Sequence, residues 1–259
     1  MSLKKMFFAI CFAIFFLHGL AQQQVHVKYY HVRSPIATLY EDLYIKDNNV
    51  ISIQDSIINF NSAGTMAAVK SSSKPISKNY FISKLNTGGK TKDFFFTGLN
   101  KEVKYFVHDQ VAEPGWKIDE SKTKKILGYN CIQAKGIFRG SEITAYFTKE
   151  LPYSAGPFKF YGLPGVILDI REDNKNFNIW KAEKVELTVD PKINFTPALS
   201  DYPKITMKEF IELKEGNQEK EMADLLSRMP PGTKVQNNSN KRPGIEKSFE
   251  WESIYRSKN

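Results

Sequence analysis

The chain has 259 residues, a formal net charge of +9 at pH 7 and a hydrophobic fraction of 41%. This apolar content is enough for a folded core, which excludes a disordered protein, and the length suits one domain with an extension. The surplus of lysine and arginine fits either a basic soluble surface or contact with an anionic membrane surface.

Residues 1–21 have the three parts of an export signal. Two lysines precede the apolar run MFFAICFAIFFL, and small residues stand at the −3 and −1 positions before Gln22. The run is too short to cross a bilayer as a helix, which disfavours the alternative of an uncleaved anchor, and no later stretch is suited to span one. We therefore expect a cleaved signal peptide and a mature protein in the periplasm or cell envelope, or secreted, with no nucleic acid as partner.

The mature chain from 22 to 190 alternates between apolar and polar side chains, with the two-residue period of half-buried strands. Strands are predicted at 25–30, 38–45, 50–53, 56–60, 79–84, 93–97, 102–107, 116–119, 124–138, 141–148, 166–171 and 177–189. A polar stretch at 61–77 is predicted to be a loop, and the Arg-Gly pair at 139–140 is predicted to close a hairpin. Because the connections are short and carry no helix, neighbouring strands should pair antiparallel. The sequence thus predicts a mainly β (α+β) fold with a single curved antiparallel sheet.

The pattern changes beyond the predicted sheet. Helical spacing of apolar residues at 206–213 and 219–229 predicts two helices in a C-terminal extension over 191–231. Residues 232–259 are predicted to be a flexible polar tail, with an edge segment at 249–251 as the alternative.

Motifs for catalysis are missing from the sequence, which has no zinc-ligand spacing, nucleophile elbow or phosphate-binding loop. We therefore expect no catalytic residue, no metal and no cofactor, and interpret the protein as non-enzymatic. His26 and His31 are interpreted as solvent-facing strand residues. Cys131 is the one cysteine of the predicted mature chain, so no internal disulfide can form, and its alternating segment favours a buried core thiol over a nucleophile or metal ligand.

Residues 156–165, termed the GLPG segment, combine three glycines and two prolines with apolar and aromatic side chains. A proline followed by glycine is typical of a tight turn with a positive φ at the second residue, which predicts such a φ at Gly165. Gly162 would let the backbone pass close to another element. The segment is too apolar for an exposed loop, so it either fills the open face of the sheet as a plug or lines an apolar pocket. The candidate ligand- or partner-binding residues are Gly156, Pro157, Phe158, Phe160, Tyr161, Gly162, Leu163, Pro164 and Gly165.

The stretch 162–167, GLPGVI, resembles the motif that names the GLPGLI family of exported bacterial proteins, with Val166 in place of leucine. The stretches KILGYNC at 125–131 and AYFT at 145–148 are similar to further landmarks of that family and occur in the same order. The resemblance covers residues 25–189. It implies a half-open antiparallel barrel similar to those that carry lipoprotein acyl chains, an envelope partner, and no catalytic residue to transfer.

These observations predict a non-catalytic cell-envelope binding or accessory protein that holds an apolar ligand, such as a lipid or acyl chain, or an outer-membrane partner. One alternative is a structural interaction module with a filled sheet and no ligand. The other is an enzyme with an unrecognised site, for which Cys131 is the candidate nucleophile.

Overall fold

The computed structural model describes residues 24–55, 59–62, 65–68, 78–85, 89–188, 190–199, 201–230, 242 and 244–252. The predicted signal peptide at 1–21 lies outside the described residues. So do residues 63–64 and 69–77 of the predicted loop and, within the predicted tail, residues 232–241, 243 and 253–259. Residues 61–62 and 65–68 belong to strands, so the loop prediction is wrong there.

Fourteen strands and one long helix follow each other along the described chain, with a further helical turn at 250–252. The strands are β1 (Val25–Ser34), β2 (Ala37–Lys46), β3 (Asn49–Gln54), β4 (Asn59–Ser62), β5 (Thr65–Ala68), β6 (Asn79–Lys84), β7 (Thr91–Asn100), β8 (Val103–Ala112), β9 (Lys117–Ile126), β10 (Tyr129–Phe138), β11 (Ser141–Thr148), β12 (Val166–Glu172), β13 (Ile179–Leu187) and β14 (Lys204–Thr206). The helix is α2 (Met207–Ser227). The fold is therefore mostly β with a C-terminal helix, as the sequence predicts.

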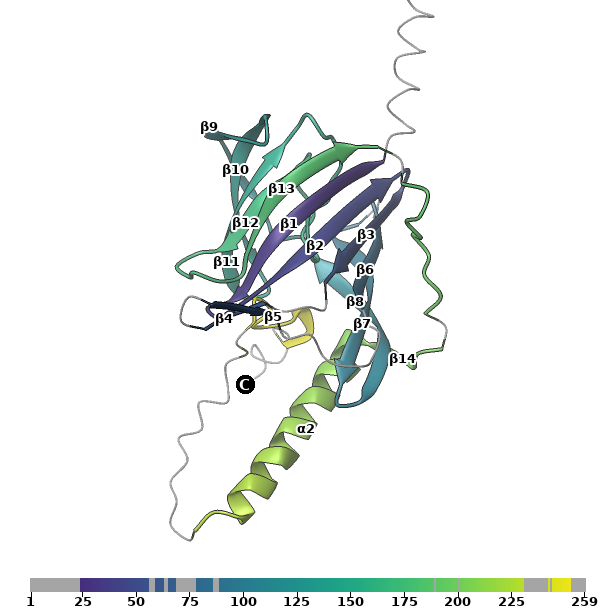
Figure 1. The fold of residues 1–259 in the computed structure, drawn as a ribbon, viewed down its shortest axis with the longest axis vertical. Coiled ribbons are helices and arrows are strands. Elements are labelled where there is room, and N and C mark those ends of the chain that lie inside the picture. The colour runs from purple at the N-terminus through teal and green to yellow at the C-terminus, as the bar shows by residue number, and fades with distance from the viewer. Residues whose placement is uncertain are drawn as a thin grey trace, which may run out of the picture.

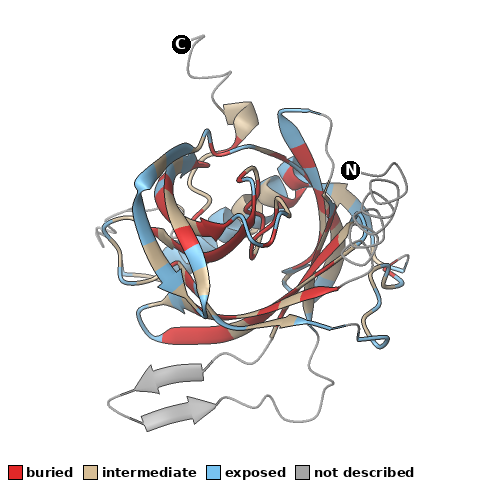
Figure 2. Ribbon diagram, turned by 90° about the horizontal axis from the view of Figure 1, so that it is seen from above, coloured by how far each residue is buried: buried red, intermediate tan, exposed pale blue. Residues whose placement is uncertain are grey.

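The strands form one sheet in the order β14-β8-β7-β6-β3-β2-β1-β13-β12-β11-β10-β9, with the β4–β5 hairpin attached to β2. Among the described strands, every pairing is antiparallel except that of β14, which runs parallel to β8, so the sheet is mixed and the purely antiparallel prediction is wrong at this edge. Pairing of β1 with β13 joins the first and second halves of the chain. The sheet curls without closing into a barrel, and β9 and β14 remain its edges (Figures 1 and 2).

Two tight turns set the hairpins around β10. Arg139 and Gly140 have φ values of 43° and 82°, as the two central residues of a type I′ turn require, and the predicted hairpin is confirmed. Leu127 and Gly128 also both have positive φ and join β9 to β10. The single strand predicted at 124–138 is therefore wrong, because this second turn divides it.

The C-terminal part differs from its prediction in two respects. One continuous helix replaces the two predicted helices, and it begins with a capping box in which Thr206 and Glu209 satisfy each other's backbone N–H groups. Residues 244–252 are packed against the body, with Ile245 and Phe249 buried, so the flexible-tail prediction is wrong for this stretch. Apolar contacts and ion pairs with distant residues hold it, and neither is readable from local composition.

Candidate functional site

The GLPG segment lies in the connection from β11 to β12 and is enclosed by the concave side of the sheet. Figure 2 looks along the inside of the curved sheet and shows buried segments of chain in the space that the strands surround. Phe160 is only 1% exposed, Tyr161 and Leu163 are also buried, and Pro164 reaches the surface. The segment therefore packs as a plug, the first of the two arrangements that its composition predicts.

Aromatic rings hold the plug against strands from both halves of the sheet. Phe160 packs edge-to-face on Trp180 of β13, with ring centroids 5.3 Å apart, and on Phe138 of β10 at 4.9 Å. Phe158 packs on Phe81 of β6 at 5.1 Å. Edge-to-face pairs of this kind add to the stability that comes from burial alone.

Close backbone approaches explain two glycines of the motif. Gly162 has a φ of +98°, and a Cβ there would stand 2.5 Å from Cγ of Glu113. Gly165 does not have the predicted positive φ. Glycine is required at this position by a close contact, because a Cβ there would lie 2.0 Å from the carbonyl oxygen of Thr148.

Close contacts also fix Gly156, at the start of the segment, and Tyr161, near its middle. The Tyr161 hydroxyl donates to the carbonyl of Val111 on β8 at 2.7 Å, and the indole N–H of Trp116 donates to the Tyr161 carbonyl at 2.7 Å. Burial raises the pKa of Tyr161. Gly156 lies directly against the side chain of Ile167, and Pro157 is buried beside it.

A buried carboxylate anchors the middle of the segment. Glu41 of β2 accepts hydrogen bonds from the backbone N–H of Phe158, from Trp180 Nε1 at 3.0 Å, from Gln54 Nε2 at 2.9 Å and from the hydroxyl of Ser52. Burial raises the pKa of Glu41, and the four donors oppose that increase. The carboxylate is thus saturated by donors of the protein and serves as a structural anchor.

A second buried group of charges lies at the other side of the segment. Lys159 Nζ is 2.7 Å from Asp109 Oδ2 on β8, and Arg139 binds the same carboxylate through both of its terminal nitrogens. Burial opposes the ionisation of Asp109, but Lys159 and Arg139 outweigh it and lower the pKa of that carboxyl. Glu246 and Glu250 complete this ion cluster from the C-terminal segment. Local sequence patterns do not indicate the cluster, because its members are far apart in the chain.

The histidines do not lie as predicted. His31 is buried and stacks on Trp180, with ring centroids 3.9 Å apart, and burial followed by the charge of Arg33 lowers its pKa to about 3. Both of its ring nitrogens lack a hydrogen-bond partner within the described structure. His26 is half-buried between Asp42 and Glu186, whose hydrogen bonds outweigh desolvation and raise its pKa.

Two further buried groups have shifted pKa values. Cys131 is buried as the alternation predicts, and burial raises its pKa to about 11, which makes the thiol a poor nucleophile at neutral pH. Lys92 on β7, which the sequence did not single out, lies over the rings of Phe94 and Tyr161, and burial lowers its pKa to about 8. Among the described residues, no cluster of His, Cys, Asp and Glu is suited to hold a metal ion.

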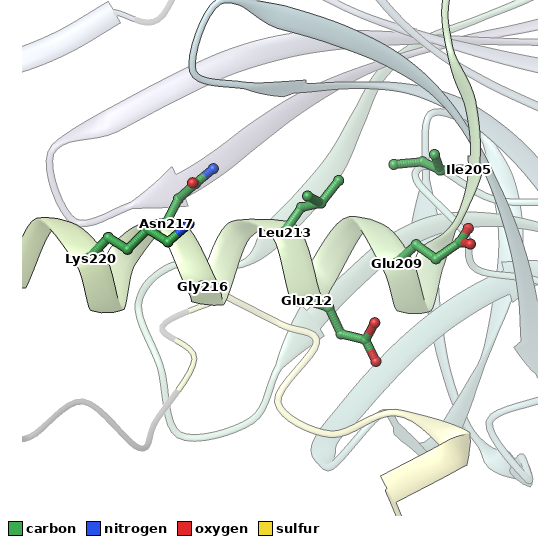
Figure 3. A pocket seen from close by; sticks show the side chains of 7 residues that line it. All are labelled: Ile205, Glu209, Glu212, Leu213, Gly216, Asn217 and Lys220. Carbon is green, nitrogen blue, oxygen red and sulfur yellow. The ribbon is translucent and has the colours of Figure 1, made fainter.

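A groove of about 510 Å³ follows the first half of α2, outside the sheet. Its lining residues are Ile205, Glu209, Glu212, Leu213, Gly216, Asn217 and Lys220. Figure 3 shows Leu213 and Asn217 on the same side of the helix as Ile205, with Glu212 directed away.

Within the described part of the chain, no helix is long and apolar enough to cross a membrane.

These features define a class: an open, curled β-sheet protein with an irregular segment of its own chain buried against the concave face. The sequence model of a family described as "Protein of unknown function (Porph_ging)" matches residues 137–169, a stretch that contains the GLPG segment. No curated protein matches the sequence.

Solved structures show weak similarity to this chain. "Structure of PNGF-II in P21 space group" aligns with a TM-score of 0.49 at 13% identity, covering 74% of this chain and 33% of that one. The C2 crystal form of PNGF-II gives 0.48 at 14%, covering 85% and 37%. An uncharacterized conserved protein from Thermus thermophilus gives 0.36 at 9%, covering 72% and 91%. The chain spans about a third of the length of PNGF-II, and no function is transferred from these similarities.

Proposed function

We propose that this chain is an exported, non-catalytic accessory protein of the cell envelope, that it belongs to the GLPGLI family, and that it acts by binding another protein. The observation that carries this proposal is the burial of the GLPG segment within the sheet, with Phe160 at its centre. A barrel-like sheet can hold an apolar ligand when its interior is not filled by side chains. Occupation of the concave face by a buried segment of the chain itself supports an interaction module over a carrier.

Export and family membership rest on the sequence. The N-terminal 21 residues have the charge, apolar run and small residues of a signal peptide. The GLPGVI motif lies at 162–167, and the match to a family of unknown function at 137–169 is consistent with a GLPGLI-type protein.

The proposed docking surface is the exposed apolar side of α2. The first turn of the helix packs on the sheet through Met207 and Phe210, and the remainder extends away from the body (Figure 1). Leu225 is 49% exposed, and Met222 and Leu226 are exposed beside it at helical spacing. Exposed apolar residues at helical spacing are a common element for recognition by a partner groove. The partner expected in the envelope is an outer-membrane protein.

The proposal is tested by site-specific photo-crosslinking in the native cell. A crosslinking residue at Leu225 should yield an adduct with an envelope protein, and the same residue at Leu127, which is 46% exposed in the turn between β9 and β10, should not. Native mass spectrometry of the same purified protein should give the bare polypeptide mass. Absence of any adduct, together with a defined mass that extracts as lipid, would refute a protein-binding role in favour of a carrier.

A further inference from the structure

The ion cluster around Arg139 and Lys159 has the geometry of a receptor for carboxylates. Lys159 is 1% exposed and Arg139 is 3% exposed at their side chains. Within the sheet and the GLPG segment, these two cations face one buried carboxylate, that of Asp109, which both of them contact. One positive charge is therefore left without a counter-charge from the body of the protein, which is strongly unfavourable in a buried place.

The C-terminal segment supplies the missing negative charge. Glu246 Oε1 lies 2.5 Å from Arg139 Nη1 and 2.8 Å from Lys159 Nζ. Glu250 lies four residues further along the chain and accepts from Arg139 Nε at 3.1 Å and Nη2 at 3.0 Å. Two carboxylates four residues apart therefore share the donors of one guanidinium and one ammonium group.

The remaining contacts of this segment resemble those of a bound peptide. The Phe249 ring lies against the Arg139 guanidinium at 4.8 Å and joins an aromatic cluster with Phe210 of α2. The backbone N–H groups of residues 247 and 248 both donate to the Arg139 carbonyl, and the Ser141 hydroxyl donates to the Ile245 carbonyl. The segment thus has a specific seat on the β10–β11 turn.

Two observations indicate that the segment can be displaced. It pairs with no strand of the described sheet, so its release breaks no strand pairing, although it does break hydrogen bonds to Ala112, Arg139 and Ser141. Its carboxylates are also partly accessible, with side-chain exposures of 17% for Glu246 and 31% for Glu250, whereas the cations beneath them are enclosed. Release also removes Ile245 and Phe249 from their buried positions, so it requires a competitor that replaces these contacts as well as the two carboxylates.

We propose that Arg139 and Lys159 form a receptor for an acidic peptide segment of a partner protein, and that residues 244–252 occupy it as an internal ligand. The preferred partner segment carries two carboxylates four residues apart with an aromatic residue next to the second, as Glu246, Phe249 and Glu250 do. This inference rests on the proposed protein-binding function but concerns a different surface from α2. Its test can fail while the crosslinking at Leu225 succeeds, and the reverse also holds.

The experiment uses the full mature chain and a labelled peptide with the sequence of residues 244–252, GIEKSFEWE. The E246Q/E250Q protein should bind this peptide at least about tenfold more tightly than the unaltered protein, because its internal competitor is weakened. Addition of Lys159→Met to that variant should abolish binding, and the peptide GIQKSFQWE should not bind. The matched control E212Q/E219Q changes two exposed carboxylates of α2 and should behave as the unaltered protein does.

A measurement on the unaltered chain keeps the test decisive if E246Q/E250Q does not fold. Hydrogen–deuterium exchange within residues 244–252 should accelerate when the GIEKSFEWE peptide is in excess and stay constant with GIQKSFQWE. Unchanged exchange with both peptides, or binding that survives Lys159→Met, would show a permanent structural clasp and overturn the proposal. Dimers of the E246Q/E250Q protein that grow with concentration would identify a second copy as the occupant and also overturn it.

Discussion

The GLPG segment and helix α2 both lie outside the strand pairing of the sheet, but different interactions hold them in place. The GLPG segment has almost no regular structure, yet aromatic rings, a buried carboxylate and an ion cluster hold it from several strands. The helix is regular and capped, yet only its first turn is buried. The contribution of each region to stability therefore depends on its tertiary contacts and not on whether it forms regular secondary structure. Substitutions in the irregular GLPG segment should lower the free energy of unfolding more than substitutions in α2.

The largest expected effect breaks the packing of the plug. Phe160→Ala should lower the free energy of unfolding by about 3 to 5 kcal/mol, because it removes a ring that contacts Phe138 and Trp180 and leaves a cavity. Leu225→Ala on the exposed side of α2 should change it by less than about 0.5 kcal/mol. Urea denaturation followed by tryptophan fluorescence measures both. Equal losses in the two variants would contradict the contrast between the regions.

The next comparison uses one glycine from each region. Gly165→Ala should cost about 3 kcal/mol, the upper part of the range for overpacking, because its Cβ would meet the backbone carbonyl of Thr148, which the sheet holds in place. Gly216→Ala within α2 meets no atom within 4 Å and should stabilise the protein by about 0.5 to 1 kcal/mol through helix propensity. Thermal unfolding by circular dichroism measures both changes. A tolerated Gly165→Ala would mean that the connection from β11 to β12 can move away from the sheet.

The smallest expected effect is a pH dependence of stability that comes from His31, a buried residue beside the plug. The pKa of His31 is about 3 in the folded protein and ordinarily about 6.5, so the unfolded state binds more protons between these values. Stability is therefore fully present above about pH 6.5 and is lost as the pH falls toward 3. The loss between pH 7 and pH 5 should be about 2 kcal/mol.

His31→Phe, which keeps an aromatic ring on Trp180, should remove that loss and leave the stability at pH 7 nearly unchanged. Denaturant titrations of both proteins at pH 7, 6 and 5 provide the check. Parallel pH profiles for the two proteins would show that His31 is not the group responsible. Asp109 serves as an internal reference, because its lowered pKa confines its own contribution to more acidic solution.

Local patterns predicted the sheet because alternation records which side of a strand is buried. The odd-numbered residues Val25, Val27 and Tyr29 of β1 are all buried, and the Arg139-Gly140 turn forms where the residue types require it. The missed turn at Leu127-Gly128 has a physical reason. Only its glycine is suited by type to a positive φ, and the apolar residue before it reads as a continuing strand.

The candidate site could be predicted only in its central part. The density of apolar and aromatic residues in the GLPG segment indicates that it avoids water, which its burial bears out. The binding role assigned to these residues stays a prediction. Nothing in the sequence relates Glu41 to Phe158, or Lys159 to Asp109 and Glu246, because such pairs are joined by the curvature of the sheet and not by spacing along the chain.

By itself, the sequence of this protein determined a mostly β chain with tight hairpins, a capped helix and an apolar segment between two strands. These properties depend on side-chain period and backbone preference, which act over a few residues. The tertiary structure alone decided that β1 pairs with β13, that the apolar segment fills the concave face, and that residues 244–252 return to neutralise Arg139 and Lys159. Those outcomes depend on contacts that buried charges and aromatic rings make with residues distant in the sequence, as the separation of 87 residues between Lys159 and Glu246 illustrates.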